Sequence, residues 1–175
     1  MENLSKNIIS ILLRDGIGVL PTDTLYGLVG SAFSRVAVER IYKVRKRDRR
    51  KPFIILISSI KDLQKFSIKL SKRHRLFLGQ IWPGPVSVIF SCKSKRFLYL
   101  HRGTWSLAFR LPRPSWLRKL LQKTGPLVAP SANTEGRKPA YTIDEAQKYF
   151  GESIDFYVNH GIMRSEPSLL VEIKR

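Results

Sequence analysis

Cysteine is almost absent from the 175 residues, because Cys92 stands alone. One cysteine cannot form an internal disulfide, which favours a reducing compartment, and we expect a cytoplasmic protein. Paired cysteines and an H-x-x-x-H pattern, the usual signatures of a zinc site, are also missing, so no metal ligands are assigned. The sequence has neither an apolar run long enough to cross a bilayer nor a signal-peptide pattern. We therefore expect no contact with a membrane.

Acidic residues are scarce as well. Thirteen Asp and Glu face 32 Lys and Arg, which gives a formal net charge of +19. Such a field attracts polyanions, so on charge alone nucleotide triphosphates, RNA and anionic lipid would all be candidates. A generally basic proteome would produce the same excess without a specific partner. The sequence lacks a glycine-rich Walker pattern, so any phosphate site must rely on side chains.

The length and the 43% hydrophobic content suit one globular domain, and no repeat or linker divides residues 1–175. Apolar periodicity and turn residues indicate helices and strands that alternate along the whole chain. Helices are expected at 4–12, from 34 onward, at 71–81, 115–123 and 142–150, and strands at 18–21, 52–57, 86–90, 107–111, 127–129, 155–158 and 169–173. We predict a single-domain α/β fold, a twisted mixed sheet flanked by helices.

Capping residues support several of these helices. Ser34 and the pairs Ser59–Asp62 and Thr142–Glu145 stand where a helix N-terminus needs side-chain oxygens. Gly16 and Gly125 follow the ends of two expected helices, the usual place for a terminating glycine.

The densest charged segment is Lys43-Val-Arg-Lys-Arg-Asp-Arg-Arg-Lys51, where seven of nine residues are basic. It joins the end of a helix to a buried strand, and loops of this kind border ligand sites in α/β proteins. Guanidinium groups donate paired hydrogen bonds to phosphate oxygens. The alternative is a solvated loop whose charge only favours a helix C-terminus.

Two further segments place polar side chains directly after short apolar strands. Pro130-Ser-Ala-Asn133 can direct a hydroxyl and an amide into one cleft, and Pro21-Thr-Asp-Thr24 supplies hydroxyl groups next to Gly27. The alternative for both segments is an ordinary turn, with Asp23 as a turn cap.

These segments also match a known pattern in chain order. The matching stretches are Pro21-Thr-Asp-Thr-Leu-Tyr-Gly-Leu28, the basic segment before Lys51-Pro-Phe53, Trp82-Pro-Gly-Pro-Val-Ser87, Leu107-Ala-Phe-Arg-Leu-Pro112, Gly125-Pro-Leu-Val-Ala-Pro-Ser-Ala-Asn133 and, more weakly, Pro167-Ser168. Together they resemble the YrdC/TsaC family of threonylcarbamoyl-AMP synthases, over a region from about Gly18 to Val171.

The resemblance implies a concave basic groove and a nucleotidyltransferase that joins L-threonine, bicarbonate (or CO2) and ATP. The product would be threonylcarbamoyl-AMP, used by downstream tRNA threonylcarbamoyl transferase proteins to modify tRNA. It implies ATP as substrate. We expect magnesium on the phosphates, and the net charge of +19 favours contact with tRNA or other RNA. The catalytic positions that it implies are Arg45, Arg47, Ser131 and Asn133, and the substrate-binding positions are Thr22, Lys51, Ser87, Arg110 and Ser168.

One departure from the family pattern concerns Arg45, which stands where the family has lysine in its Lys-x-Arg pair. A planar guanidinium and a compact ammonium are not interchangeable in a crowded site. The chain also ends at Arg175, before a short segment that the family usually carries. With the high charge, these departures favour a second hypothesis, a non-catalytic RNA-binding protein that kept the groove. Against it, residues 43–51 contain no aromatic side chain on which a base could stack.

Overall fold

The computed structural model describes residues 2–173, and their side chains from residue 6 onward. The side chain of Leu4, one of the apolar positions expected in the first helix, lies outside this range. The α-helices are α1 (Glu2–Leu13), α2 (Arg35–Arg45), α3 (Lys72–Ile81), α4 (Leu98–His101), α5 (Ser115–Thr124) and α6 (Ile143–Phe150). Short 3-10 helices form η1 (Ile60–Phe66), η2 (Lys95–Phe97) and η3 (Gly151–Ser153).

Within the described residues, eight strands form one mixed sheet in the order β7-β1-β2-β6-β3-β5-β4-β8. The strands are β1 (Ile17–Pro21), β2 (Tyr26–Ser31), β3 (Ile54–Leu56), β4 (Val86–Ser91), β5 (Ser106–Arg110), β6 (Leu127–Val128), β7 (Phe156–Tyr157) and β8 (Leu169–Glu172). The pairs β7–β1, β3–β5 and β4–β8 are parallel, and the other neighbours are antiparallel. The predicted α/β fold with a mixed sheet is confirmed.

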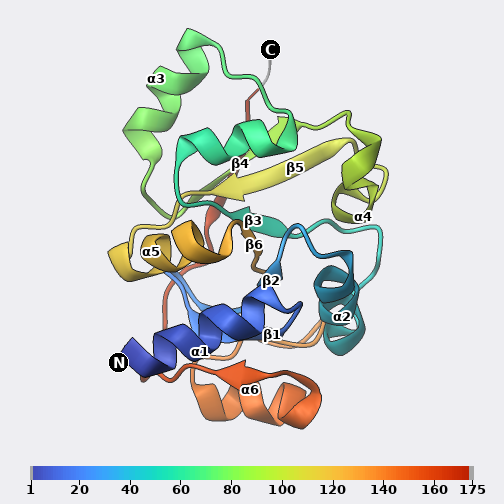
Figure 1. Cartoon of the computed structure of the whole chain (residues 1–175), viewed down its shortest axis with the longest axis vertical. Helices are drawn as coiled ribbons and strands as arrows, with labels where there is room; N and C mark the ends of the chain where they lie inside the picture. Colours follow the sequence, from blue (N-terminus) through green and yellow to red (C-terminus); the bar gives the residue numbers. More distant parts are fainter. Residues whose placement is uncertain (1, 174–175) are drawn as a thin grey trace.

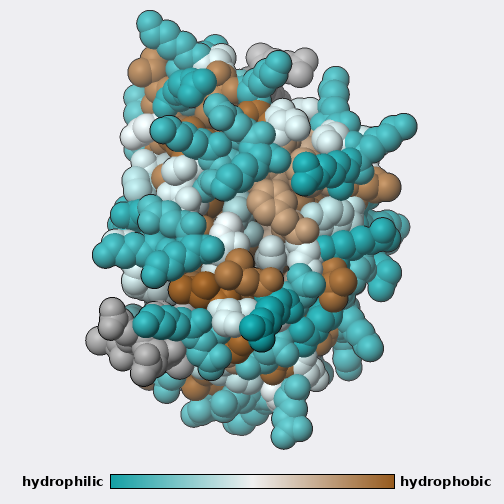
Figure 2. All heavy atoms as spheres, viewed as in Figure 1, coloured by the Kyte–Doolittle hydropathy of each residue, from teal (hydrophilic) through white to brown (hydrophobic). Residues whose placement is uncertain are grey.

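Both faces of the sheet are covered. Val19 and Leu28 belong to one apolar cluster, whereas their chain neighbours Leu20 and Val29 belong to another. Successive side chains of a strand point to opposite faces, so each cluster packs on one face. One cluster includes residues of α1 and α5, which lie side by side over the sheet in Figure 1, and the other includes residues of α2 and α6. Figure 2 shows hydrophilic side chains over most of the same view.

The predicted caps are largely observed. The Ser34 hydroxyl accepts from Ala37 N, and Ser59 forms the predicted capping box with Asp62, although the helix that follows is a 3-10 helix. Thr142 Oγ1 accepts from Glu145 N, but the Glu145 carboxylate accepts from Tyr141 N, one residue before the expected partner.

Strand β2 was not among the predicted strands. It contains two glycines in Tyr26-Gly-Leu-Val-Gly-Ser31, and glycine is poorly suited to strands by itself. Packing overrides this preference, because a Cβ on Gly30 would approach Ile17 at 2.9 Å and Ile41 at 3.1 Å. The close approach of α2 to the sheet therefore requires a residue without a side chain at this position.

Glycine is also required at Gly18, which lies opposite Phe156 where β1 pairs with β7. A Cβ at this position would overlap the Phe156 ring. We expect Gly18→Ala to lower the free energy of unfolding by about 1–3 kcal/mol, as overpacked cores do. Gly79→Ala in α3 is the matched control, because a Cβ at this position meets nothing within 4 Å. This change should raise the free energy of unfolding by roughly 0.5–1 kcal/mol, since alanine is favoured over glycine inside a helix. Urea denaturation measures both, and equal effects of the two changes would contradict this packing.

Candidate functional site

The end of α2 and the loop after β6 meet through the side chain of Arg45. Its Nε donates to the Asn133 carbonyl oxygen at 2.8 Å, and its Nη2 donates to Asn133 Oδ1 at 3.1 Å and to Ser131 Oγ at 3.4 Å. Ser131 Oγ also donates to Asn133 Oδ1 at 2.6 Å. Three of the four predicted catalytic residues therefore form one hydrogen-bonded group across 88 positions of sequence.

Arg45 is buried, with 3% of its surface exposed. Burial, together with the charge of Arg47, lowers its pKa to about 10, so the guanidinium keeps its charge at neutral pH. Its observed hydrogen bonds hold the Ser131–Asn133 segment in place. The prediction that Arg45 itself contacts a phosphate stays a prediction.

The remaining cations of this loop gather around a carboxylate that the sequence analysis did not select. Lys51 Nζ lies 2.8 Å and Arg47 Nη1 lies 3.9 Å from Glu135 Oε1. Asp48 N donates to Glu135 Oε2 at 2.7 Å. The hydrogen bond from Lys51 is the main cause that lowers the pKa of Glu135. One signal was available, since Glu135 is the first acidic residue after Asp62.

A second group surrounds Arg110 at the end of β5. Its Nη2 lies 3.3 Å from Asp23 Oδ1, and its Nη1 donates to Thr24 Oγ1 at 3.3 Å. Both side chains of the ion pair are buried, with exposed fractions of 4% for Arg110 and 5% for Asp23. Burial lowers the pKa of Arg110, and the Asp23 charge opposes this change. Asp23, considered only as a turn cap from the sequence, instead holds a guanidinium from a distant strand.

The hydrogen bonding of this ion pair is incomplete. Asp23 Oδ1 and Arg110 Nε are buried and have no hydrogen-bond partner among the described residues. The other oxygen, Asp23 Oδ2, accepts from Arg113 N at 3.2 Å. A buried guanidinium with an unused N–H can donate to a carboxylate or another anion as a further partner.

The Arg45 group and the Arg110 group lie next to each other, and Thr22 connects them. Thr22 Oγ1 lies 3.2 Å from Thr24 Oγ1, which in turn bonds Arg110. Gly27 lies opposite Ser131 in an isolated bridge, and a Cβ on Gly27 would lie 3.1 Å from Thr22 Cγ2. The absence of a side chain at Gly27 thus lets the Thr22 loop pack against the Ser131 segment.

Ser87 and Ser168 complete the predicted set. Their hydroxyl oxygens lie 2.9 Å apart, where β4 meets the start of β8. The register that pairs Val88 with Phe109 places Ser87 opposite Arg110 at the next position. Opposed residues of antiparallel strands project from the same face, so this pair borders the Arg110 group. The structure brings all nine predicted residues into adjoining groups, and the concave basic groove around them stays a prediction.

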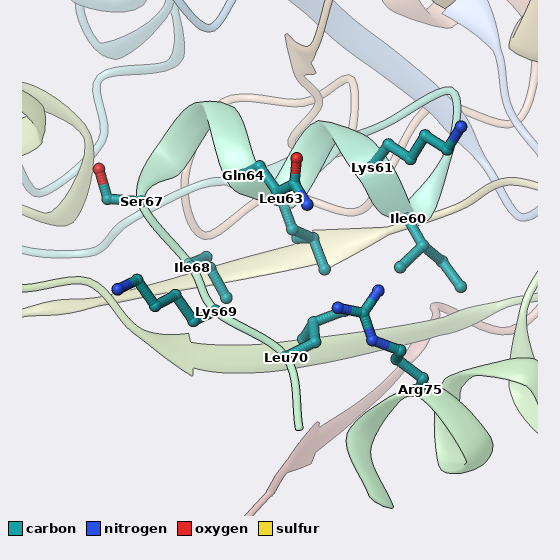
Figure 3. Close-up of a pocket in the computed structure, with 9 residues that line it drawn as sticks. All are labelled: Ile60, Lys61, Leu63, Gln64, Ser67, Ile68, Lys69, Leu70 and Arg75. Carbon is teal, nitrogen blue, oxygen red and sulfur yellow. The ribbon is translucent and has the colours of Figure 1, made fainter. Parts of the chain in front are cut away.

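A cavity of about 800 Å³ lies elsewhere, between η1 and α3 (Figure 3). In this close-up Arg75, Ile60 and Leu70 converge below η1. None of the nine predicted residues lines this cavity; its lining consists of Ile60, Lys61, Leu63, Gln64, Ser67, Ile68, Lys69, Leu70 and Arg75.

In the described part of the chain, no group of three His, Cys, Asp or Glu side chains is arranged to hold a metal ion. Over the same residues, no helix is long and apolar enough to span a membrane.

The loops of this α/β sheet bring together guanidinium groups, hydroxyls and an amide, which are hydrogen-bond donors of the kind that carboxylates and phosphates accept. Residues 10–175 match the profile of the Sua5, YciO and YrdC proteins, a family described as "Telomere recombination". The chain belongs to this family.

A curated relative agrees with this assignment, and two solved structures share the fold. A Nitrosococcus oceani protein named threonylcarbamoyl-AMP synthase is 31% identical over 161 residues, which cover 90% of this chain and 86% of that protein. The crystal structure of Pyrococcus abyssi Sua5 complexed with L-threonine has the same fold, with a TM-score of 0.91 and 24% identity. It matches 99% of this chain, which spans about half (52%) of the Pyrococcus chain. Escherichia coli YciO has a TM-score of 0.87 at 18% identity and matches 100% of this chain and 86% of its own.

The buried Asp23–Arg110 pair should be essential for stability. Removing one charge of a buried pair leaves the other unpaired, so we expect Asp23→Asn to cost about 3–5 kcal/mol. Asp48→Asn, which removes an equivalent carboxylate from the exposed partner Arg50, is the control and should cost much less. Thermal or urea unfolding distinguishes them, and similar losses in the two variants would show that the Asp23 pair carries no special burial cost.

Proposed function

We propose that the protein is an L-threonylcarbamoyladenylate synthase, an ATP-dependent nucleotidyltransferase. The observation that carries the proposal is the contact of Arg45 with Ser131 and Asn133, which joins the basic loop to the loop after β6. The name of the Nitrosococcus relative and the bound threonine of the Pyrococcus structure support the choice of reaction. The proposed unit comprises residues 1–175 as a single domain.

The proposed reaction has two steps. The amine of L-threonine attacks the carbon of bicarbonate with loss of water (or of CO2 with loss of a proton) to form a carbamate. A carbamate oxygen then attacks the α-phosphorus of ATP. The bond from the α-phosphorus to the bridging oxygen breaks, and pyrophosphate leaves with its electron pair. Since the nucleophile is already an anion, the protein has to orient the reactants and to stabilise charge.

The proposed roles follow the grouping of the side chains. Arg47 and Lys51 hold the phosphate chain, since their side chains are partly exposed and already converge on one carboxylate. Arg45 positions Ser131 and Asn133, which orient the nucleotide or the carbamoyl group. The guanidinium of Arg110, whose Nε has no partner among the described residues, donates to the threonine carboxylate, with Thr22, Ser87 and Ser168 as neighbouring hydroxyls.

Magnesium fits this proposal as an ion held by the phosphates. Mg²⁺ keeps several waters and needs few protein ligands when triphosphate oxygens are available. Asp48 is the carboxylate of the basic loop that could reach such an ion through water, although Arg50 holds it and lowers its pKa to about 2. When bound, the ion would neutralise charge on the leaving pyrophosphate.

The further partners in this proposal are tRNA or other RNA and the proteins that transfer the threonylcarbamoyl group to tRNA, in the cytoplasm. The net charge of +19 supports contact with a polyanion. The second candidate, an RNA-binding protein without catalysis, is favoured by the same charge. Salt-sensitive RNA binding without turnover would be its signature.

The direct test is threonine-dependent release of pyrophosphate from ATP with bicarbonate present. The proposal expects release with all three substrates and none when threonine is omitted. Absence of release from folded protein, together with tight RNA binding that weakens with salt, would support the second candidate instead.

Arg47→Ala should remove most activity, with kcat/KM for ATP falling by roughly 100-fold through loss of a phosphate contact. The fold should survive, because Arg47 makes partly exposed contacts with Glu135 and Phe53. Arg49→Ala, a loop arginine with an exposed side chain, is the matched control and should keep activity. Loss of the cooperative melt in Arg47→Ala would show a structural role, and equal activity of the two variants would place the phosphates elsewhere.

A further inference from the structure

Glu135 stands where the cations of the basic loop converge. Glu135 Oε1 accepts a hydrogen bond from Lys51 Nζ at 2.8 Å and lies 3.9 Å from Arg47 Nη1. Glu135 Oε2 accepts a hydrogen bond from the backbone N–H of Asp48 at 2.7 Å. Lysine, arginine and a backbone N–H around one anion are the donor set with which proteins bind phosphate. The Glu135 carboxylate thus occupies an anion site built from other parts of the chain.

The position of Glu135 in the chain ties this anion site to the catalytic groups. Glu135 N donates to the Arg45 carbonyl oxygen at 2.8 Å, two residues beyond Asn133. The backbone is therefore fixed beside the Arg45 contact, while the side chain retains 26% exposure. A partly exposed carboxylate on a fixed backbone can rotate into solvent at low cost, unlike the buried carboxylate of Asp23.

We propose that the Glu135 carboxylate occupies the place of a phosphate group in the free protein and is displaced by the phosphate chain of ATP. This inference rests on the proposed function and deepens it. In the free protein the carboxylate keeps Arg47 and Lys51 directed at one point. When a triphosphate binds, Glu135 must leave, because two anions so close together repel each other.

The proposed displacement predicts the direction in which a substitution of Glu135 changes ATP binding. Glu135→Gln keeps the size of the side chain and an oxygen that can accept from Lys51, but it removes the competing charge. ATP should then bind more tightly, and its KM should fall by roughly 5- to 10-fold, a change typical of one partly screened charge. The KM for threonine should stay unchanged, because the proposed threonine site at Arg110 lies outside the Glu135 group.

The experiment compares the wild type, Glu135→Gln and Glu152→Gln. Glu152 lies exposed in η3, so its substitution controls for the change of one unit in net charge. The measurements are KM for ATP and for threonine, and calorimetric binding of inorganic pyrophosphate as a readout independent of turnover. The proposal expects tighter ATP and pyrophosphate binding in Glu135→Gln alone, with an unchanged melting temperature.

Two results would overturn it. A KM for ATP that is unchanged or higher in Glu135→Gln would show that the carboxylate assists binding and does not compete. If Glu152→Gln bound ATP and pyrophosphate equally more tightly, the effect would come from the change in net charge alone. If the wild type releases no pyrophosphate, the proposed function fails, and the pyrophosphate calorimetry still decides whether Glu135 occupies an anion site.

Discussion

The contact between the Arg45 guanidinium and the Ser131–Asn133 segment is the constraint on which the rest of the site depends. It joins two parts of the chain that are 88 positions apart, through three hydrogen bonds from two nitrogens. Because Arg45 is buried, its charge needs these hydrogen-bond acceptors as partners. This requirement fixes the two loops relative to each other. The planar fork of arginine suits two acceptors on one residue, which a lysine could not match in the same way.

The two groups of side chains next to the Arg45 contact each contain a carboxylate, and these two carboxylates differ in burial. Asp23 is buried against Arg110 and belongs to the fixed part of the site, where it compensates a charge that could not stand alone. Glu135 is partly exposed and compensates Arg47 and Lys51, the two cations that we propose bind the phosphate chain. The contrast suits a site that takes two anionic molecules of different size. A small carboxylate would join a fixed arginine, and a long phosphate chain would meet cations whose present partner can move.

The sequence predicted most of the fold because the signals are local. Apolar periodicity located the main helices, and Ser34 and Gly125 marked helix ends that the structure confirms. Strand β2 was missed, since its two glycines are selected by close packing, Gly30 against α2 and Gly27 against Thr22 and the loop after β6, and not by strand preference. The nine site residues came from the order of the motifs and the family resemblance. Asp23 and Glu135 could not be selected in the same way, because their partners Arg110 and Lys51 lie more than 80 positions away.

A crystal structure with a non-hydrolysable ATP analogue and L-threonine tests most directly whether these groups form one nucleotide and amino-acid site. The account predicts the triphosphate beside Arg47 and Lys51, the threonine carboxylate at Arg110, and the Arg45–Asn133 contact preserved between them. A triphosphate bound in the cavity between η1 and α3, with Arg47 and Lys51 still held by Glu135, would contradict it.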